Sequence, residues 1–192
     1  LFRSPLSGLD AIQLSVPVVQ AMCRDQKPDL VTWGTVAPSL RWSNIAREVM
    51  LDAGLDPYIP AYTTVMACAT SMVAVFSAAS QLTDGRGSLA MAGGTESMSR
   101  VQLGLSQKLS DWLRRFFQAK SLSGRAEMLS NLPLHDVRLH IPSITNRTTG
   151  KTMGEGCEDM AKTWAIARVP QDELARQGHQ RAIAAQAKGF FS

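Results

Sequence analysis

A single cysteine, Cys68, lies between an extended run and a long apolar helix in the stretch YTTVMACATSMVAVFSAA. The positive end of a helix favours the thiolate, which is the nucleophilic form of a cysteine. Four small residues surround it: Ala67, Ala69, Thr70 and Ser71. An acyl group can therefore approach the sulfur closely, as covalent catalysis requires. The residues alone favour the other interpretation, a buried cysteine that packs as a small hydrophobe.

Two helices are predicted before this cysteine. Apolar residues recur at helical spacing over residues 9–23, and Pro17 is expected to kink or shorten that helix. A second helix is predicted over residues 43–54, with Ser43 as its N-cap and Gly54 as its stop.

Three extended runs separate the predicted helices, at residues 29–36, 61–67 and 88–94. The helix over residues 69–82 consists of small and apolar residues, so we expect it to be buried on most sides. Strands that alternate with crossover helices indicate a mostly parallel sheet. The predicted fold class is α/β.

The second half of the sequence has a different pattern. Residues 101–150 show no alternation of strand and helix, and residues 154–191 form two amphipathic helices separated near Val169-Pro170. We therefore expect an α/β domain over residues 1–100 and a mainly helical domain over residues 101–192.

Composition and charge exclude several classes of protein. A formal net charge of +4 fits an anionic small ligand or a membrane surface, but is too weak to indicate nucleic-acid binding. The three cysteines form no CxxC pair, which favours a reducing compartment over a disulfide framework. His135 and His140 are five residues apart with no carboxylate cluster beside them, so no metal site is assigned.

Four motifs together resemble the thiolase family. The first two are VMACATSM, which contains Cys68, and AGGTESMS about twenty-five residues later. The second matches the family's GGxExMS motif at Gly93, Gly94, Glu96, Met98 and Ser99. TMGEGCEDMA is similar to MGxxxExxA, and RVPQDELARQGHQRAIA is similar to a helix in which Gly178 replaces the usual serine. FRSP near the start resembles the family's RTP motif.

This resemblance implies both a chemistry and a set of roles. Thiolases cleave 3-ketoacyl-CoA with a second coenzyme A, or run the reverse Claisen condensation, with the cysteine that matches Cys68 becoming acylated. Coenzyme A is then a substrate, and no permanently bound cofactor is implied. Met153 and Gly154 match substrate- and CoA-binding positions of the loop domain. Four residues are expected to support the site structurally: Gly93, Gly94, Glu96 and Ser99. We expect Glu96 to hold the cysteine loop by hydrogen bonds.

The sequence also departs from the family. The base and the second cysteine of thiolases lie in GHP and CxGGG motifs, and neither occurs here. The expectation is a partial N-terminal domain, whose first strand before FRSP is missing, followed by an incomplete loop domain. Val65 stands where an asparagine is common, and Ser71 replaces a glycine and is expected to narrow the acyl slot. The alternatives are a thiolase-like protein that binds acyl-CoA or lipid without condensing it and, less favoured by GGTESMS, a β-ketoacyl synthase.

The segment from Lys108 to Lys120 has its own pattern. Basic residues flank one apolar helical face made of Leu109, Trp112, Leu113, Phe116 and Phe117. The pattern indicates either a helix at a membrane surface or one that packs on its own protein or a partner.

The MAC and TMG variants resemble the branch of the family found in the fatty-acid-oxidation trifunctional complex. That branch implies β-oxidation, a homodimer or tetramer, and a hydratase–dehydrogenase partner subunit. It also implies the bacterial cytoplasm or the mitochondrial matrix, with attachment to a membrane surface.

Overall fold

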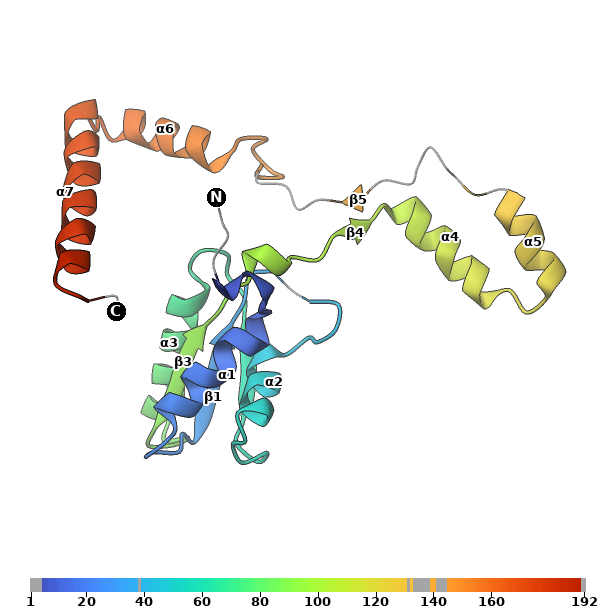
Figure 1. Ribbon diagram of the computed structural model, residues 1–192, viewed down its shortest axis with the longest axis horizontal. Helices are drawn as coiled ribbons and strands as arrows, with labels where there is room; N and C mark the ends of the chain where they lie inside the picture. The colour runs from blue at the N-terminus through green and yellow to red at the C-terminus, as the bar shows by residue number, and fades with distance from the viewer. Residues whose placement is uncertain (1–4, 38, 131, 133–138, 141–144, 191–192) are drawn as a thin grey trace. The chain divides into compact units, whose positions relative to one another are not determined.

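The computed structural model describes residues 5–37, 39–130, 132, 139–140 and 145–190 (Figure 1). Most of the FRSP motif lies outside these residues. The chain divides into two compact units, Leu1–Gly104 and Leu105–Ser192. The expected domain boundary lies slightly earlier, after residue 100. The identity of the two units as a thiolase N-terminal domain and a loop domain remains a prediction.

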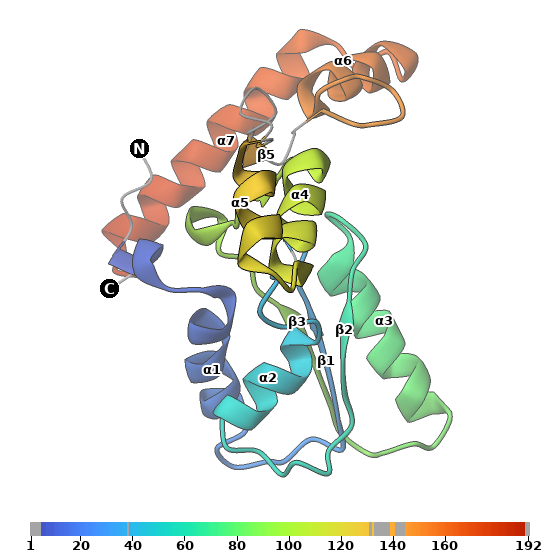
Figure 2. The same ribbon diagram turned by 90° about the vertical axis from the view of Figure 1, so that its right-hand side faces the viewer.

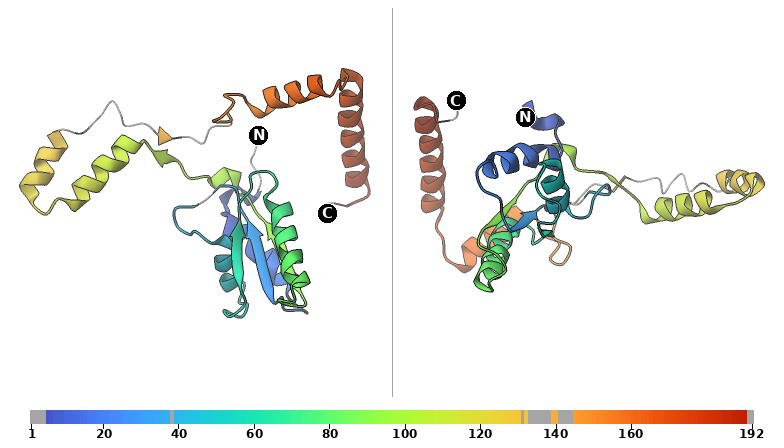
Figure 3. Two further views of the ribbon diagram at one scale, coloured as in Figure 1. Left: turned by 180° about the vertical axis from the view of Figure 1, so that it is seen from behind. Right: turned by 90° about the horizontal axis from the view of Figure 1, so that it is seen from below.

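The first unit contains a three-stranded parallel sheet. Strand β1 (Leu30–Gly34) lies between β2 (Ala61–Thr64) and β3 (Ala90–Gly94), as Figure 3 shows from behind. In the register of both pairs, Val31 lies opposite Ala61 and Met91. The predicted α/β class with a parallel sheet is confirmed. All three strands end at the same edge of the sheet, where the candidate site residues follow them.

Helices cover both faces of this sheet (Figure 2). Helices α1 (Ala11–Met22) and α2 (Ile45–Asp52) pack on one face, and α3 (Thr70–Thr83) packs on the other. Neighbouring residues of a strand point to opposite faces. Trp33 accordingly enters the apolar core beneath α1 and α2, whereas the hydroxyl of Thr32 donates to the Ala74 carbonyl of α3 at 2.9 Å.

The start of α1 is capped and its middle tolerates a proline. Asp10 is the N-cap and forms a capping box with Gln13, which stabilises the first turn. Pro17 was expected to kink or shorten the helix, but α1 continues past it to Met22. Proline removes one intrahelical hydrogen bond, and the buried residues Ala11, Ser15 and Val19 fix the helix on both sides of it.

Asn44 is the N-cap of α2, and the prediction of Ser43 was wrong by one position. The Asn44 amide oxygen accepts from the Arg47 backbone N–H at 3.2 Å and from the Thr63 hydroxyl at 2.9 Å. The second bond ties the helix start to β2, a contact that local sequence does not reveal. Gly54 follows the helix with φ +77°, as expected for its stop.

Helix α3 is buried along one stripe only, so the prediction of burial on most sides was wrong. Thr70, Ala74 and Ala78 face the sheet, whereas Met72 and Phe76 are 56% and 67% exposed. A helix made of small and apolar residues has no polar face by which the sequence could identify its exposed side. Within the first unit, no described residue covers this apolar face.

The second unit consists mainly of helices. Its helices are α4 (Gln107–Gln118), α5 (Leu122–Ser130), α6 (Met153–Thr163) and α7 (Arg168–Ala187). Strand β4 (Gly104–Leu105), at the division between the units, pairs with β5 (Leu139–His140). Two short 3-10 helices, η1 (Pro5–Gly8) and η2 (Met98–Arg100), belong to the first unit. The break between α6 and α7 comes at residues 164–167, a few residues before the predicted position. Pro170 lies in the first turn of α7. No described helix is long and apolar enough to cross a membrane.

Helices α4 and α5 form a hairpin in which the aromatic face of α4 has a partner. The ring of Trp112 stacks on Phe116 with centroids 5.2 Å apart, and the Arg125 guanidinium of α5 lies 6.0 Å from the Phe116 centroid. The Trp112 indole N–H donates to the Met128 carbonyl at 3.2 Å. Phe117 remains 73% exposed. Most of the predicted apolar face is therefore turned toward its own unit.

Candidate active site

Cys68 lies in the connection between β2 and α3, at the carboxyl edge of the sheet. Strand β2 ends at Thr64, Ala69 is the N-cap of α3, and the Cys68 side chain is exposed. The preceding residue, Ala67, has φ +44°, a left-handed conformation that is uncommon for a residue with a Cβ. This turn carries Cys68 away from the strand and in front of the first turn of the helix.

The Thr70 hydroxyl closes this turn. It accepts from the Met66 backbone N–H at 2.8 Å and donates to the Ala67 carbonyl at 2.6 Å. Two backbone bonds reinforce the same loop, from Ala69 N–H to the Met66 carbonyl at 3.0 Å and from Thr70 N–H to the Ala67 carbonyl at 3.1 Å. Both neighbours of Cys68 are thus held by hydrogen bonds.

Glycines at the strand ends permit the close approach of the surrounding elements. A Cβ on Gly34 would lie 2.2 Å from the Thr70 methyl group, and a Cβ on Gly93 would lie 2.5 Å from the Trp33 ring. A Cβ on Gly94 would lie 2.9 Å from the Gly34 carbonyl oxygen. The glycine pair predicted near the site is therefore required by packing between β1 and β3.

Cys68 borders a shallow hollow of about 210 Å³. Its walls come from the ends of all three strands, and include Thr35 after β1, Ser71 in α3 and Glu96 after β3. Ser71, which replaces the glycine common in the family, lies in this hollow. The expectation that it narrows the acyl slot remains a prediction.

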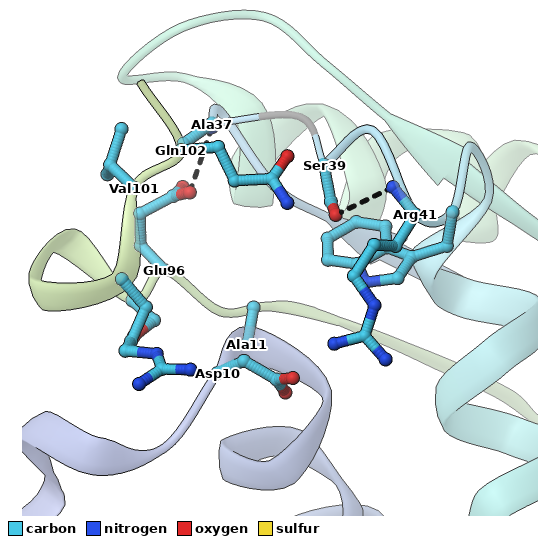
Figure 4. Close-up of a pocket in the computed structure, with 11 residues that line it drawn as sticks. Asp10, Ala11, Ala37, Ser39, Arg41, Glu96, Val101 and Gln102 are labelled. Carbon is cyan, nitrogen blue, oxygen red and sulfur yellow. Dashed lines mark hydrogen bonds between the residues drawn. The ribbon is translucent and has the colours of Figure 1, made fainter. Parts of the chain in front are cut away.

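The Glu96 carboxylate holds the loop after β1. The expectation that it holds the cysteine loop was wrong. It accepts from the Thr35 hydroxyl at 2.9 Å and from the backbone N–H groups of Val36 and Ala37 at 2.7 and 2.8 Å. Figure 4 shows it beside Ala37, at a second hollow of about 150 Å³. Because Thr35, Val36 and Glu96 all line the Cys68 hollow, the carboxylate both forms part of its wall and holds the neighbouring loop in place.

Ser99 is exposed in η2, and hydroxyls that the sequence did not single out make the buried contacts. Ser97 donates to the Leu9 carbonyl at 2.6 Å. Ser15, fully buried in α1, accepts from the Trp33 indole N–H at 3.0 Å and lies 2.8 Å from the Thr95 hydroxyl. For Ser15, the signal in the sequence was a hydroxyl on the apolar stripe of the helix predicted over residues 9–23.

Met153 and Gly154 are the first two residues of α6, in the second unit. Thr152 caps this helix, and its hydrogen bonds to the Glu155 carboxylate lower the pKa of that group. Met153 is 67% exposed. The structure describes each unit by itself, so the proposed part of these residues in substrate binding remains a prediction.

The other two cysteines have different environments. Burial raises the pKa of the Cys23 thiol, which lies 3.9 Å from the Met91 sulfur. Cys157 is exposed and lines an apolar hollow of about 520 Å³ between α6 and α7, together with Trp164 and Leu174. Among the described residues no group of His, Cys, Asp or Glu side chains is arranged to bind a metal ion.

Comparison with known proteins identifies the family. The profile described as "Thiolase, N-terminal domain" matches residues 5–192. The chain is 36% identical over 187 residues to a 3-ketoacyl-CoA thiolase of Escherichia fergusonii, covering 95% of this chain and 43% of that protein. A 3-ketoacyl-CoA thiolase of Shigella flexneri gives the same identity and coverage. The chain thus spans less than half the length of these relatives.

Solved structures agree with this fold. Acetyl-CoA acetyltransferase of Bacillus anthracis superposes with a TM-score of 0.74 at 25% identity, covering 99% of this chain and 45% of that one. Acat5 thiolase from Ascaris suum, solved in complex with coenzyme A, gives a TM-score of 0.77 at 21% identity, with coverage of 99% and 46%, and supports the fold alone. Given the family profile, the relatives and the motifs around Cys68, the chain belongs to the thiolase family.

Proposed function

We propose that Cys68 is the nucleophile of a thiolase reaction that cleaves 3-ketoacyl-CoA into acetyl-CoA and a shortened acyl-CoA, or runs the reverse Claisen condensation. The observation that carries this proposal is the position of Cys68, exposed on a tight turn before a helix and bordering a hollow at the carboxyl edge of a parallel sheet. Ligands of open α/β sheets bind at this edge. The names of the relatives supply the substrate class.

The proposed reaction proceeds in two steps. The Cys68 sulfur attacks the keto carbon, the bond between that carbon and its neighbour breaks, and the electron pair leaves on acetyl-CoA. The α-carbon of the departing acetyl-CoA, which keeps that electron pair, takes up the proton that the Cys68 thiol gives up. The thiol of a second coenzyme A then attacks the acyl-cysteine, the sulfur–carbon bond to Cys68 breaks, and the proton of the incoming thiol returns to Cys68. A covalent intermediate divides one difficult step into two easier ones.

Further parts of the proposal rest on the family resemblance. Coenzyme A enters as a substrate and is not permanently bound. Met153 and Gly154 contact the acyl-CoA, and Gly93, Gly94, Glu96 and Ser99 support the cysteine from neighbouring segments. The two structural units act as the N-terminal domain and the loop domain of a thiolase.

The proposed setting is fatty-acid β-oxidation in a bacterial cytoplasm or a mitochondrial matrix. We propose a homodimer or tetramer that associates with a hydratase–dehydrogenase subunit. The segment from Lys108 to Lys120 is the proposed contact with a membrane surface. Since Trp112 and Phe116 contact α5, that contact would depend mainly on the exposed Phe117.

Mass spectrometry of the acylated protein tests the role of Cys68. The intact enzyme that contains residues 1–192 is incubated with a 3-ketoacyl-CoA and quenched, and the adduct is mapped. We expect an acyl group on Cys68, and none in the Cys68→Ala variant. Cys157 is the built-in control because it is also exposed. An acyl group on Cys23 or Cys157 instead would overturn the assignment.

The second candidate is a protein that binds acyl-CoA or lipid without condensing it. The same experiment separates the two candidates, because a binding protein would retain acyl-CoA without forming an adduct on Cys68.

A further inference from the structure

Thr70 performs two tasks with the two halves of its side chain. Its methyl group occupies the space next to Gly34, where a Cβ on the glycine would approach to 2.2 Å. Its hydroxyl bridges the Met66 N–H and the Ala67 carbonyl, at 2.8 and 2.6 Å. The side chain is 5% exposed. The methyl group thus packs beside Gly34 while the hydroxyl is held by its own hydrogen bonds to the turn.

The turn needs such a clamp because Ala67 is left-handed, with φ +44°. A residue with a Cβ stays in this region only when its surroundings hold it there. The Ala67 carbonyl accepts from both the backbone N–H and the hydroxyl of Thr70. Cys68 is the next residue, so any relaxation of Ala67 changes the direction of the Cys68 side chain.

We propose that Thr70 is a positioning residue for Cys68, whose hydroxyl fixes the left-handed turn that aims the thiol at the acyl carbon. This inference rests on the proposed function. Thr70 does not touch the reacting atoms. Its effect passes through the backbone of Ala67, which makes it distinguishable from a residue that only stabilises the fold.

Two substitutions separate the two halves of the side chain. Thr70→Val keeps the shape that packs on Gly34 and loses both hydroxyl hydrogen bonds. Thr70→Ser keeps the hydroxyl and loses the methyl group. The matched control is Thr83→Val, because the Thr83 hydroxyl bonds the Ala79 carbonyl at the other end of the same helix, at 3.0 Å.

Two rates are measured for each variant in the intact enzyme that contains residues 1–192. One is acylation of Cys68 by a 3-ketoacyl-CoA, which needs a directed thiol. The other is alkylation of Cys68 by iodoacetamide relative to Cys157, which needs only an exposed thiol. Thr70→Val should lower acylation about 10- to 100-fold, the range expected for a misplaced reacting group. In Thr70→Val the alkylation of Cys68 relative to Cys157 should change less than about twofold. Thr70→Ser and Thr83→Val keep the Thr70 hydroxyl and its hydrogen bonds, so both should keep acylation within about threefold of wild type.

Several outcomes would overturn the proposal. If Thr70→Val is acylated as fast as wild type, the hydroxyl does not position the thiol. If Thr70→Ser loses as much acylation as Thr70→Val, the hydroxyl alone does not position the thiol and the proposal fails. If Thr70→Val fails to fold or loses alkylation in parallel with acylation, Thr70 is purely structural. If wild-type Cys68 is alkylated but never acylated, the proposed function itself fails, and with it this role.

Discussion

At the scale of single residues, Glu96 shows how one carboxylate can shape a site without touching its nucleophile. It accepts three hydrogen bonds from residues 35–37, and two of these residues, Thr35 and Val36, line the Cys68 hollow. A glutamine offers one acceptor oxygen and two N–H donors. Glu96→Gln should therefore leave at least one donor unpaired and reduce the free energy of unfolding by about 1–3 kcal/mol.

Hydrogen exchange at the backbone of Val36 and Ala37 checks this prediction. Exchange at both amides should accelerate in Glu96→Gln, because the carboxylate accepts from both. Glu48→Gln is the control, since the Glu48 carboxylate has no hydrogen bond among the described residues. Unchanged exchange at Val36 and Ala37 in Glu96→Gln would show that the loop does not depend on this carboxylate.

Asp29 gives a pH-dependent prediction at the opposite edge of the sheet. Hydrogen bonds from the Ser88 N–H, the Leu89 N–H and the Ser88 hydroxyl lower the pKa of the Asp29 carboxyl. A group whose pKa is lower in the folded state stabilises the fold above its unfolded pKa, here about 3.9. That stabilisation is lost as the pH falls through the lower, native pKa. The difference in urea midpoint between wild type and Asp29→Asn should thus be largest near neutral pH and shrink in acid.

The matched control for this prediction is Asp25→Asn, because no hydrogen bond or ion pair of the Asp25 carboxylate is found among the described residues. Its midpoint should follow wild type at every pH. A difference between wild type and Asp29→Asn that stays constant or grows in acid would contradict the proposed linkage.

At the scale of elements, the sequence predicted the order and type of the helices and strands better than it predicted which of their faces are buried. The alternation of β-branched runs with apolar helical spacing located β1, β2, β3 and their helices, because both periods are local properties of the chain. The N-cap of α2 was missed because a hydrogen bond from Thr63, nineteen residues away, helps to hold Asn44 in the N-cap position. The exposed face of α3 was missed because small apolar residues look alike on every side.

The candidate site was predictable to a similar degree. Cys68 and the Gly93-Gly94 pair were located by type and motif, whereas the target of Glu96 and the clamp made by Thr70 depend on how loops fold back. Side-chain hydrogen bonds across 59 to 61 positions, such as those of Glu96, leave no periodic signal in a sequence.

Helix α4 supports a prediction about membrane attachment. Phe116 contacts Trp112 and Arg125, so its removal would disturb the hairpin, whereas Phe117 is 73% exposed. Burial of one phenylalanine contributes about 1.5–3 kcal/mol at most, and each nearby basic residue adds about 1 kcal/mol at an anionic surface. Phe117→Ser should therefore abolish co-sedimentation with anionic vesicles and leave folding intact.

Val169→Ser is the control for vesicle binding, because Val169 is similarly exposed, at 76%, in α7. It should sediment with vesicles as wild type does. If Phe117→Ser also sediments as wild type, the membrane contact proposed for the segment from Lys108 to Lys120 is wrong. The aromatic face of α4 would then serve the contact with α5 alone.

At the scale of the whole molecule, large apolar side chains are exposed in both units. Met72, Val75 and Phe76 form such a face on α3, and Trp164 and Leu174 border the hollow between α6 and α7. Contiguous apolar surface of this kind marks places where proteins contact other groups. The relatives, of which this chain spans 43%, contain further chain that can cover such surfaces.

The last prediction is that a polypeptide limited to residues 1–192 has no thiolysis activity. Thiolases draw their base and second cysteine from GHP and CxGGG motifs, which are absent from these residues. Loss of one general acid–base group commonly costs about 10²- to 10⁴-fold in rate. The consumption of a 3-ketoacyl-CoA by the polypeptide should match that of its Cys68→Ala variant, with the full-length Bacillus anthracis enzyme as the positive control. Turnover at about 1 s⁻¹ or faster, the range of ordinary enzymes, would show that residues 1–192 supply a base that the family motifs do not predict.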